Sequence, residues 1–460
     1  MFSNIPPAAK PILLLTFVNA IGGTLLIPVL PFVVRDLGQS DLVFSLLIAA
    51  YPAAQFFAAP ILGSMADHYG RRPILLVSQA GTLASWGVFA LAYAFTDSPG
   101  IAVGLLAVSR LVDGLTGGNA SVAAAYLADT VPADARTAVF SMQGAVAGVA
   151  LLMGPALGSA SADTSIGFLG PAILAIALSL ATLVWMASSL VESLDPDHRT
   201  PAFDANPLHQ LNLIAKARTL TGRQTLVRLF TVQAAFTLAF SAYMTIVPLW
   251  YVDRLGISEA AVGLMMVATG VFLIFNEMVT LRFVERLRGD VGTLLTGLAI
   301  LPIAFVLLRI PTTVVTFLPI AFVANIGMAL VLPTLQSVVT QAADEAEEGQ
   351  VQGINTSISA LASAIAPIVA GVLYAGPGGS VTILVAAGAA AVAALVAGAS
   401  APMLRAATGE PPTDAASAHR VHGPIHALAS KVSGGQRSFC LRVNGDEHEH
   451  HGLRQRQPSP

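Results

Sequence analysis

The feature that most constrains this chain is a series of long apolar stretches, each long enough to cross a lipid bilayer. About 20 mostly apolar residues span the roughly 30 Å of hydrocarbon as a helix, which satisfies its own backbone polar groups. Twelve such stretches follow one another, near residues 11–34, 42–62, 74–95, 101–122, 138–160, 168–190, 226–251, 260–281, 292–309, 312–335, 352–374 and 380–403. They predict an all-α polytopic membrane protein with twelve transmembrane helices.

Composition argues against most other classes of protein. Charged residues make up 11% of the 460 residues, against about 25% in soluble domains. This disfavours a water-soluble enzyme or a disordered chain, and the net charge of −3 provides no basic field for nucleic acid. Cys440 is the only cysteine, so no intrachain disulfide and no thiolate metal site can form. The expected partners are the lipid bilayer and a small-molecule substrate, and the expected state is a monomer.

The spans fall into two groups of six. Residues 1–190 and 226–403 each hold six spans, and residues 191–225 form a polar linker between them. Residues 404–460 are rich in Gly, Pro and His, which is typical of a disordered tail. Within the tail, Asp446–His451 offers carboxylates and imidazoles to a metal ion, but a solvated tail is the preferred interpretation, and no metal site is expected.

Basic residues predict the orientation, because cytoplasmic loops are enriched in Lys and Arg. With a cytoplasmic N-terminus, 19 basic residues lie inside and three lie outside, namely Arg35, Arg254 and Arg309. We therefore expect a multi-pass protein of the cell membrane (plasma or inner) with both termini cytoplasmic.

Two loops of the first half recur in the second half. Residues 35–40 read RDLGQS and residues 253–258 read DRLGIS, an offset of 218 residues. The loop after the second span aligns with residues 282–295 at an offset of 219, with Gly70 matching Gly289. Chance similarity between loops is the alternative to an internal duplication. If the duplication holds, two pseudo-symmetric six-helix bundles place a binding cavity between them, near the middle of the membrane.

The loop between spans 2 and 3 is the most specific local signal. It reads GSMADHYGRRP from Gly63 to Pro73. Gly63 and Gly70 permit a close helix approach and a tight turn, and Asp67 lies four residues before Arg71, which is followed by Arg72. A basic loop that only fixes the topology is the simpler alternative.

Three charged residues lie within spans. Arg110 and Asp113 are three residues apart in span 4, so both face one side of a helix and can pair. Charge inside a membrane is costly and commonly marks an ion or proton pathway, although a self-neutralising structural pair is the alternative. Glu277 lies about one turn from the end of span 8, where an interfacial carboxylate is as reasonable as a proton carrier.

Span 5 holds two pairs of glycines at four-residue spacing, Gly144 with Gly148 and Gly154 with Gly158, together with Pro155. Small residues at this spacing allow tight helix packing, and the proline can kink the helix.

Polar and aromatic side chains within the apolar spans are the candidates for a substrate cavity. Polar groups in spans normally face protein or a water-filled cavity, and many simply bridge helices. The candidates are Asn19, Gln55, Gln143, Gln233, Phe236, Phe240, Tyr243, Asn325, Gln336 and Asn355. Few charges and several aromatic rings suit amphipathic organic molecules better than sugars or phosphates.

Together these motifs resemble the major facilitator superfamily, and within it the twelve-span drug:proton antiporters, most closely the tetracycline efflux group. The resemblance runs from about Leu14 to Tyr374 and includes the first span, Ala124–Asp129 and Gly349–Gly353. It implies the fold of that superfamily, a cytoplasmic latch formed by Asp67 with Arg71 and Arg72, and a part for Arg110 in proton coupling. The glycines and proline of span 5 resemble the antiporter motif, which importers of the same fold generally lack.

The chain also departs from the tetracycline pumps, which carry acids in spans 1, 3 and 9 and a histidine in span 8. Asn19, Ser85 and Leu273 stand at three of these positions, span 9 has no acid, and Glu277 replaces a glutamine. These departures weigh against a tetracycline–metal chelate as the substrate. Any proton carrier in the spans is then Asp113 or Glu277.

The expected function is proton-coupled efflux of small amphipathic organic compounds, with a tetracycline-like compound as one candidate, the proton as coupling ion and no cofactor. A metabolite or sugar facilitator or importer on the same fold is the alternative. A membrane enzyme is disfavoured because the spans contain no histidine and the chain no HExxH motif. A sensor is disfavoured because the tail is short.

Overall fold

The structure is a computed structural model that describes residues 6–7, 9–200, 223–343 and 348–410. Residues 411–460, including the histidine-rich run, lie outside the described residues. The first half contains α1 (Ala9–Leu25), α2 (Leu30–Asp36), α3 (Asp41–Tyr69), α4 (Arg71–Ala92), α5 (Pro99–Gly117), α6 (Ala120–Thr130), α7 (Ala133–Ala162) and α8 (Leu169–Ser189). The second half contains α11 (Gln224–Leu255), α12 (Glu259–Phe275), the π-helix η4 (Asn276–Leu281), α13 (Arg282–Leu307), α14 (Val314–Gln341), α15 (Glu348–Ala375) and α16 (Gly379–Thr408).

These helices make twelve passes. Eleven stretches are long and apolar enough to span a membrane, and one of them, Ala261–Leu307, is 47 residues long. At about 1.5 Å per residue it is roughly twice as long as the hydrocarbon is thick. It contains Gly289, whose φ of 71° breaks the helix, so it comprises two passes. The described residues contain no strand, and the prediction of an all-α, twelve-pass fold is confirmed.

Two passes are interrupted. The first pass consists of α1 and α2, separated around Pro28, which removes a backbone donor and ends the α-helical run. The fourth pass consists of α5 and α6, separated at Gly118 and Asn119. A side chain at Gly118 would meet the backbone of Ala59 in α3, so glycine lets these two helices touch.

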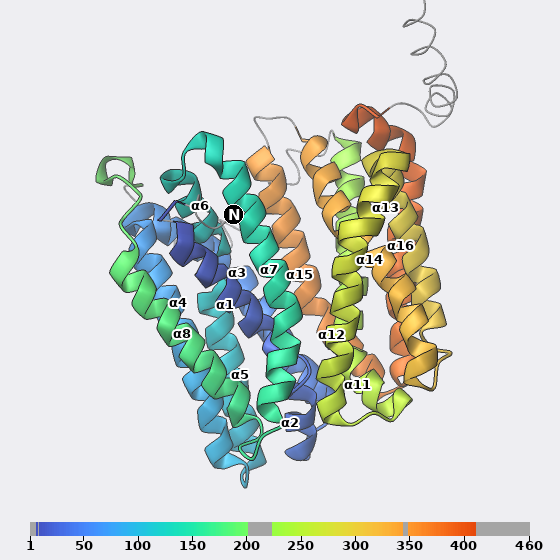
Figure 1. The fold of residues 1–460 in the computed structure, drawn as a ribbon, viewed down its shortest axis with the longest axis horizontal. Helices are drawn as coiled ribbons and strands as arrows, with labels where there is room; N and C mark the ends of the chain where they lie inside the picture. Colours follow the sequence, from blue (N-terminus) through green and yellow to red (C-terminus); the bar gives the residue numbers. More distant parts are fainter. Residues whose placement is uncertain (1–5, 8, 201–222, 344–347, 411–460) are drawn as a thin grey trace, which may run out of the picture. The chain divides into compact units, whose positions relative to one another are not determined.

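The two halves repeat one pattern of helix pairing. In the first half α1 packs on α7 and α8, α5 packs on α3 and α4, and α4 packs on α8. In the second half α11 packs on α15 and α16, α14 packs on α12 and α13, and α13 packs on α16. Matching loops also match in conformation, since Gly38 and Gly256 have φ of 67° and 63°, and Gly70 and Gly289 have φ of 107° and 71°. Figure 1 shows the two bundles side by side, which confirms the pseudo-symmetric arrangement.

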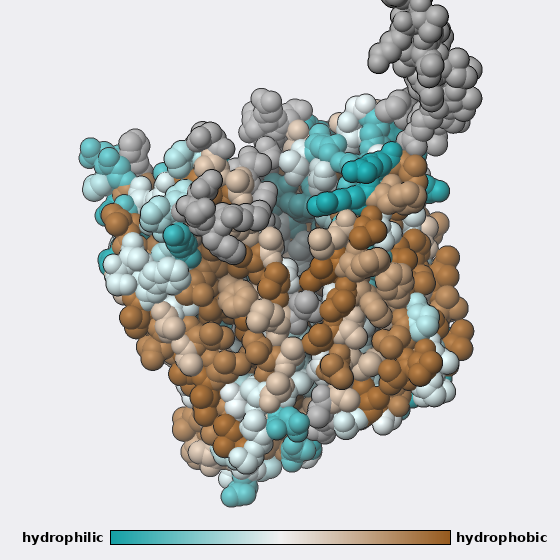
Figure 2. Space-filling view, viewed as in Figure 1, coloured by the Kyte–Doolittle hydropathy of each residue, from teal (hydrophilic) through white to brown (hydrophobic). Residues whose placement is uncertain are grey.

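The outer surface is apolar along most of the helix length. Leucines and valines such as Val184, Leu264 and Leu395 are 60–72% exposed, as expected for side chains that face lipid. Figure 2 shows hydrophobic residues over the middle of this face and hydrophilic residues concentrated toward its two ends. We call the end that holds Arg35 and Asp253 the Arg35 end, and the opposite end, at the top of Figure 1, the Arg71 end.

Candidate transport site and gates

A cavity lies between the two bundles. It encloses about 300 Å³ and is lined by residues of α1, the segment after it, α3, α5, α11 and α15. Most of its wall is apolar, and Arg110 is the only charged residue that lines it. The lining residues are Gly23, Leu26, Ile27, Leu30, Phe44, Ile48, Tyr51, Pro52, Arg110, Phe240, Ser241, Met244, Thr245, Ser363 and Pro367.

Arg110 and Asp113 form a buried ion pair beside this cavity. Nη2 of Arg110 lies 3.3 Å from Oδ2 of Asp113, and the two residues are only 4% and 5% exposed. The guanidinium carbon lies 5.1 Å from the centre of the Trp86 ring, within range of a cation–π interaction. Among the described residues, Nε of Arg110 has no hydrogen-bond partner, so a donor remains available at the cavity wall.

The buried hydroxyl of Ser85 is a neighbour of the Asp113 carboxyl. Ser85 occupies the position at which the resemblance to tetracycline pumps associates an acid with span 3. The carboxyl group in this chain is therefore carried by span 4, on the helix that packs against span 3.

Glu277 lies elsewhere. It belongs to the π-helical turn η4 and is partly exposed, and no ion-pair partner for it exists among the described residues. A π-helical turn inserts one extra residue per turn and is frequent at functional sites. Glu277 is absent from the lining of the central cavity, so the structure separates the two candidate proton carriers.

The Arg71 loop forms a compact charged cluster within the first bundle. Arg71 donates from Nη1 to Asp67 at 2.8 Å and from Nε to Asp129 of α6 at 2.7 Å. Arg72 does not pair with an acid, because its guanidinium donates to the carbonyl oxygens of Leu190 and Ala187 at the end of α8. Gly70 provides the tight turn between α3 and α4, as its positive φ requires. The close approach predicted for Gly63 is wrong, because a side chain there would meet only Ser121, at an ordinary 3.9 Å.

Two acids that the sequence analysis missed cap these loops. Oε1 of Glu192 accepts from the backbone N–H groups of Arg71, Ser193 and Leu194, and Oε2 accepts from that of Arg72. In the second bundle Glu410 accepts from the N–H of Val291, next to Gly289. The two acids are 218 residues apart, the offset of the duplicated loops. Each follows the last helix of its bundle and satisfies donors that a helix N-terminus leaves unpaired.

Glu192→Ala is expected to loosen the start of the linker. Loss of a capping carboxylate costs about 0.5–2 kcal/mol of local stability, and here it also releases the N–H groups of Ser193 and Leu194. Limited proteolysis of the purified protein should cut residues 191–225 several-fold faster than in wild type. Glu410→Ala is the matched control, since it removes the equivalent cap without touching the linker. Equal linker cleavage in both variants would show that Glu192 does not hold this segment.

The glycine pairs of span 5 differ from each other. A Cβ on Gly154 or Gly158 would run into Thr24 or the Leu25 carbonyl of the first pass, so these two glycines allow α7 to lie against α1. A Cβ on Gly144 or Gly148 would have no described atom within 4 Å, and tight packing at these two positions is not present. Pro155 contributes its carbonyl oxygen to the contact with Gly263 of α12.

The bundles touch most closely at the Arg35 end. A Cβ on Gly371 of α15 would run into Ser45 near the start of α3, and a Cβ on Gly263 of α12 would run into Ser159 near the end of α7. Toward the Arg71 end, Gly148 of α7 and Gly353 of α15 meet no described neighbour within 4 Å. The bundles are therefore joined at the Arg35 end and separated toward the Arg71 end.

Of the ten predicted cavity residues, Phe240 lines the central cavity. Several of the polar ones bridge helices, which satisfies their hydrogen bonds in an apolar environment. Asn19 donates to Asn119, Gln55 to the Gly117 carbonyl, Gln143 to Thr16, Gln233 to Ser359, Gln336 to Gln352 and Asn355 to Gln336.

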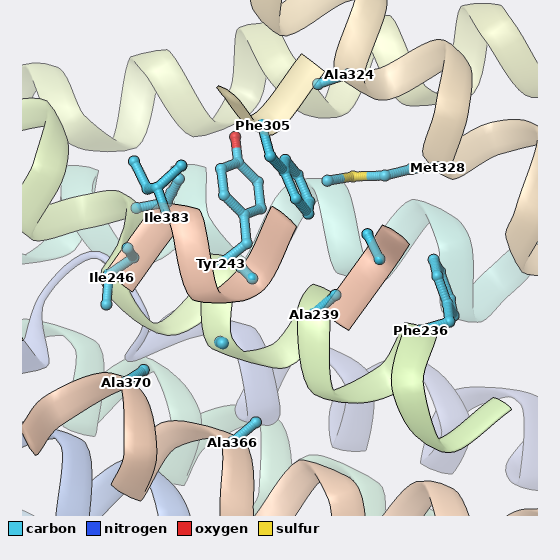
Figure 3. Packing of buried hydrophobic residues seen from close by; sticks show 14 of the residues in the cluster. Phe236, Ala239, Tyr243, Ile246, Phe305, Ala324, Met328, Ala366, Ala370 and Ile383 are labelled. Atoms are coloured by element: carbon cyan, nitrogen blue, oxygen red, sulfur yellow. The ribbon is translucent and has the colours of Figure 1, made fainter. Parts of the chain in front are cut away.

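Tyr243, Phe236 and Asn325 pack inside the second bundle. Figure 3 shows Tyr243 beside Phe305, and their ring centres are 4.9 Å apart. Phe236 is 4% exposed and stacks on Phe240. Asn325 is 5% exposed and donates to the Ala321 carbonyl one turn before it, so it is satisfied within its own helix. For these three residues the cavity assignment is replaced by a packing role, because each already has partners inside the bundle.

The polar residues that do face the cavity were not selected from the sequence. Ser241 and Ser363, from the two helices of the second bundle that line it, have hydroxyl oxygens 3.3 Å apart. Tyr51 and Thr245 complete the polar part of the wall. Serine and threonine are common in spans for packing reasons, so only their position beside Arg110 distinguishes them.

Two six-helix bundles with the same helix pairing, which meet around a cavity, define a multi-pass membrane transporter. The chain matches the family model described as Major Facilitator Superfamily over residues 12–367 and again over residues 229–437, and it belongs to that superfamily.

Individual relatives are more distant. The chain is 27% identical over 360 residues to the tetracycline resistance protein, class C, of Escherichia coli, covering 78% of this chain and 87% of that protein. It is 30% identical over 372 residues to the tetracycline resistance protein, class G, of Vibrio anguillarum, covering 80% and 90%. The crystal structure of the human organic anion transporter MFSD10 (TETRAN) aligns with a TM-score of 0.64 and 22% identity, covering 85% of this chain and 99% of that chain.

Proposed function

We propose that this protein exports small amphipathic organic compounds from the cell in exchange for protons. The observation that carries the proposal is the buried Arg110–Asp113 pair, whose arginine lines the cavity between the bundles. The relatives named for tetracycline resistance support drug efflux as the direction of transport, and a tetracycline-like compound belongs among the first substrates to test.

In the proposed orientation both termini are cytoplasmic, so the Arg71 end faces the cytoplasm. The bundles are separated toward that end, which corresponds to a state that takes up substrate from inside. Export then requires the Arg71 end to close and the Arg35 end to open, by rocking of one bundle against the other. The Arg71–Asp67–Asp129 cluster and Glu192 form the proposed cytoplasmic gate, and Gly154 and Gly158 of α7 form the contact with α1.

The proposed proton step uses the carboxyl of Asp113. When the Arg35 end is open, Asp113 takes a proton from outside and loses its ionic attraction to Arg110. When the Arg71 end is open, the proton leaves to the cytoplasm and the ion pair forms again, as in the described structure. Substrate occupies the cavity in the outward half of the cycle only. One proton therefore enters for each passage through the pair.

Two experiments test this function. Expression in a drug-sensitive bacterial host should raise resistance to some members of a panel of amphipathic compounds, including tetracyclines, and an uncoupler should abolish the effect. In proteoliposomes that contain the purified protein, an imposed pH gradient should drive uptake of the same compound against its concentration gradient. Transport that is unchanged when the pH gradient and membrane potential are collapsed would contradict antiport and favour a facilitator.

A further inference from the structure

The guanidinium of Arg35 joins the two bundles at the end opposite the Arg71 loop. It donates from Nε and Nη2 to Asp41 of α3 at 2.8 and 3.0 Å, within the first bundle. It also donates from Nη1 and Nη2 to Asp253 of α11 at 3.0 Å each, across to the second bundle. The Tyr374 hydroxyl of α15 donates to Asp253 at 2.7 Å. Two bidentate contacts on one guanidinium fix its orientation as well as its charge.

Arg35 and Asp253 occupy equivalent positions in the internal duplication. They are 218 residues apart, and the first repeat reads Arg35–Asp36 where the second reads Asp253–Arg254. Equivalent positions of two repeats related by a pseudo-two-fold axis approach each other when they lie near that axis. Identical charges would then repel, whereas the reversed order in this chain places a cation opposite an anion.

The contact also lies where the bundles are in tightest contact. Gly371 of α15 packs against Ser45 of α3, four residues after Asp41, and Tyr374 lies in the next turn of α15. The ion pair and this glycine contact therefore connect the same elements, α3 and α15, together with α2 and α11. Opening of the Arg35 end requires all of these to separate.

We propose that Arg35 is a gating residue: its bidentate pair with Asp253 holds the Arg35 end closed and sets how often that end opens. This inference rests on the proposed alternating access, with the Arg35 end as the exit. It assigns the exit gate to one inter-bundle ion pair, whereas the charged cluster at the Arg71 end lies within one bundle.

The test is the accessibility of a single cysteine in the cavity. Cys440→Ser removes the only native cysteine, and Ser363→Cys then places a thiol on the cavity wall. A membrane-impermeant maleimide is applied to intact cells and to inside-out vesicles, and a second reporter, Thr96→Cys, identifies the preparation in which the Arg35 end is exposed. From that side, Arg35→Gln and Asp253→Asn should each raise the labelling rate of the cavity cysteine at least about threefold.

Three variants sharpen the result. Asp36→Asn makes the same charge change one residue away, and Asp41→Asn removes only the contact within the first bundle; both should stay within about twofold of the parent. The exchange Arg35→Asp with Asp253→Arg should restore slow labelling. Parental rates in both Arg35→Gln and Asp253→Asn, or an exchange as open as the single variants, would overturn the assignment. Labelling needs neither substrate nor a proton gradient, so failure of drug export leaves this result interpretable, and Asp253→Asn carries the test if an Arg35 variant does not fold.

Discussion

Asp113→Asn is expected to lower proton-driven export to less than about a tenth of wild type while substrate–substrate exchange across the membrane continues. Asparagine has nearly the same shape as aspartate but cannot take up or release a proton. Arg110 then stays at the cavity wall without an ionic partner, as in the proposed protonated state. Proteoliposomes loaded with unlabelled compound measure the exchange, and an imposed pH gradient in the same preparation measures the coupled transport.

Glu277→Gln is the matched comparison, because it neutralises the other carboxyl within the spans. Glu277 does not line the cavity, so this variant should keep at least about half of the coupled transport. The opposite outcome, with Asp113→Asn still coupled and Glu277→Gln uncoupled, would move the proton step to the π-helical turn. Loss of exchange as well as coupling in Asp113→Asn would indicate a structural role for the pair, since removing one partner of a buried ion pair can cost about 3–5 kcal/mol.

Gly158→Val is expected to cause the largest loss of stability among substitutions in span 5. Its Cβ would run into the carbonyl group of Leu25, which belongs to the backbone and cannot rotate away. Overpacking alone typically costs about 1–3 kcal/mol, and separating α7 from α1 adds to that cost. Thermal unfolding of the detergent-solubilised protein, followed by the loss of the monodisperse peak, should show a clearly lower midpoint than wild type.

Gly148→Val provides the control on the same helix. No described atom lies within 4 Å of a Cβ at that position, so the midpoint should stay within about 2 °C of wild type. Similar midpoints for Gly148→Val and Gly158→Val would contradict the contact between α7 and α1 described above.

The fold was largely predictable from the sequence, because lipid leaves few ways to arrange an apolar chain. Each predicted span corresponds to a helical pass, and the repeated glycines Gly38, Gly70, Gly256 and Gly289 all have positive φ. What the apolar pattern did not predict is where helices break. The pass from α5 to α6 is interrupted at Gly118 because that backbone lies against Ala59, and only the three-dimensional contact shows it.

The candidate site was less predictable, and the reason is physical. Arg110 and Asp113 were identified because a charge in a span needs a partner or a cavity, and both are present. Amides such as Gln143 and Gln233 look the same in sequence whether they face a substrate or a neighbouring helix, and here they donate to Thr16 and Ser359. Glu192 was missed because an acid at the end of a helix resembles any surface acid until its backbone partners are known.

In the proposed mechanism, a proton leaves the Arg110–Asp113 pair when substrate enters the cavity. The most direct measurement is proton release by the purified protein in weakly buffered detergent solution with a pH indicator, upon addition of an exported compound. We expect release that saturates near one proton per protein molecule in wild type and no release from Asp113→Asn. Equal release from wild type and Asp113→Asn, with both binding the compound, would contradict the mechanism.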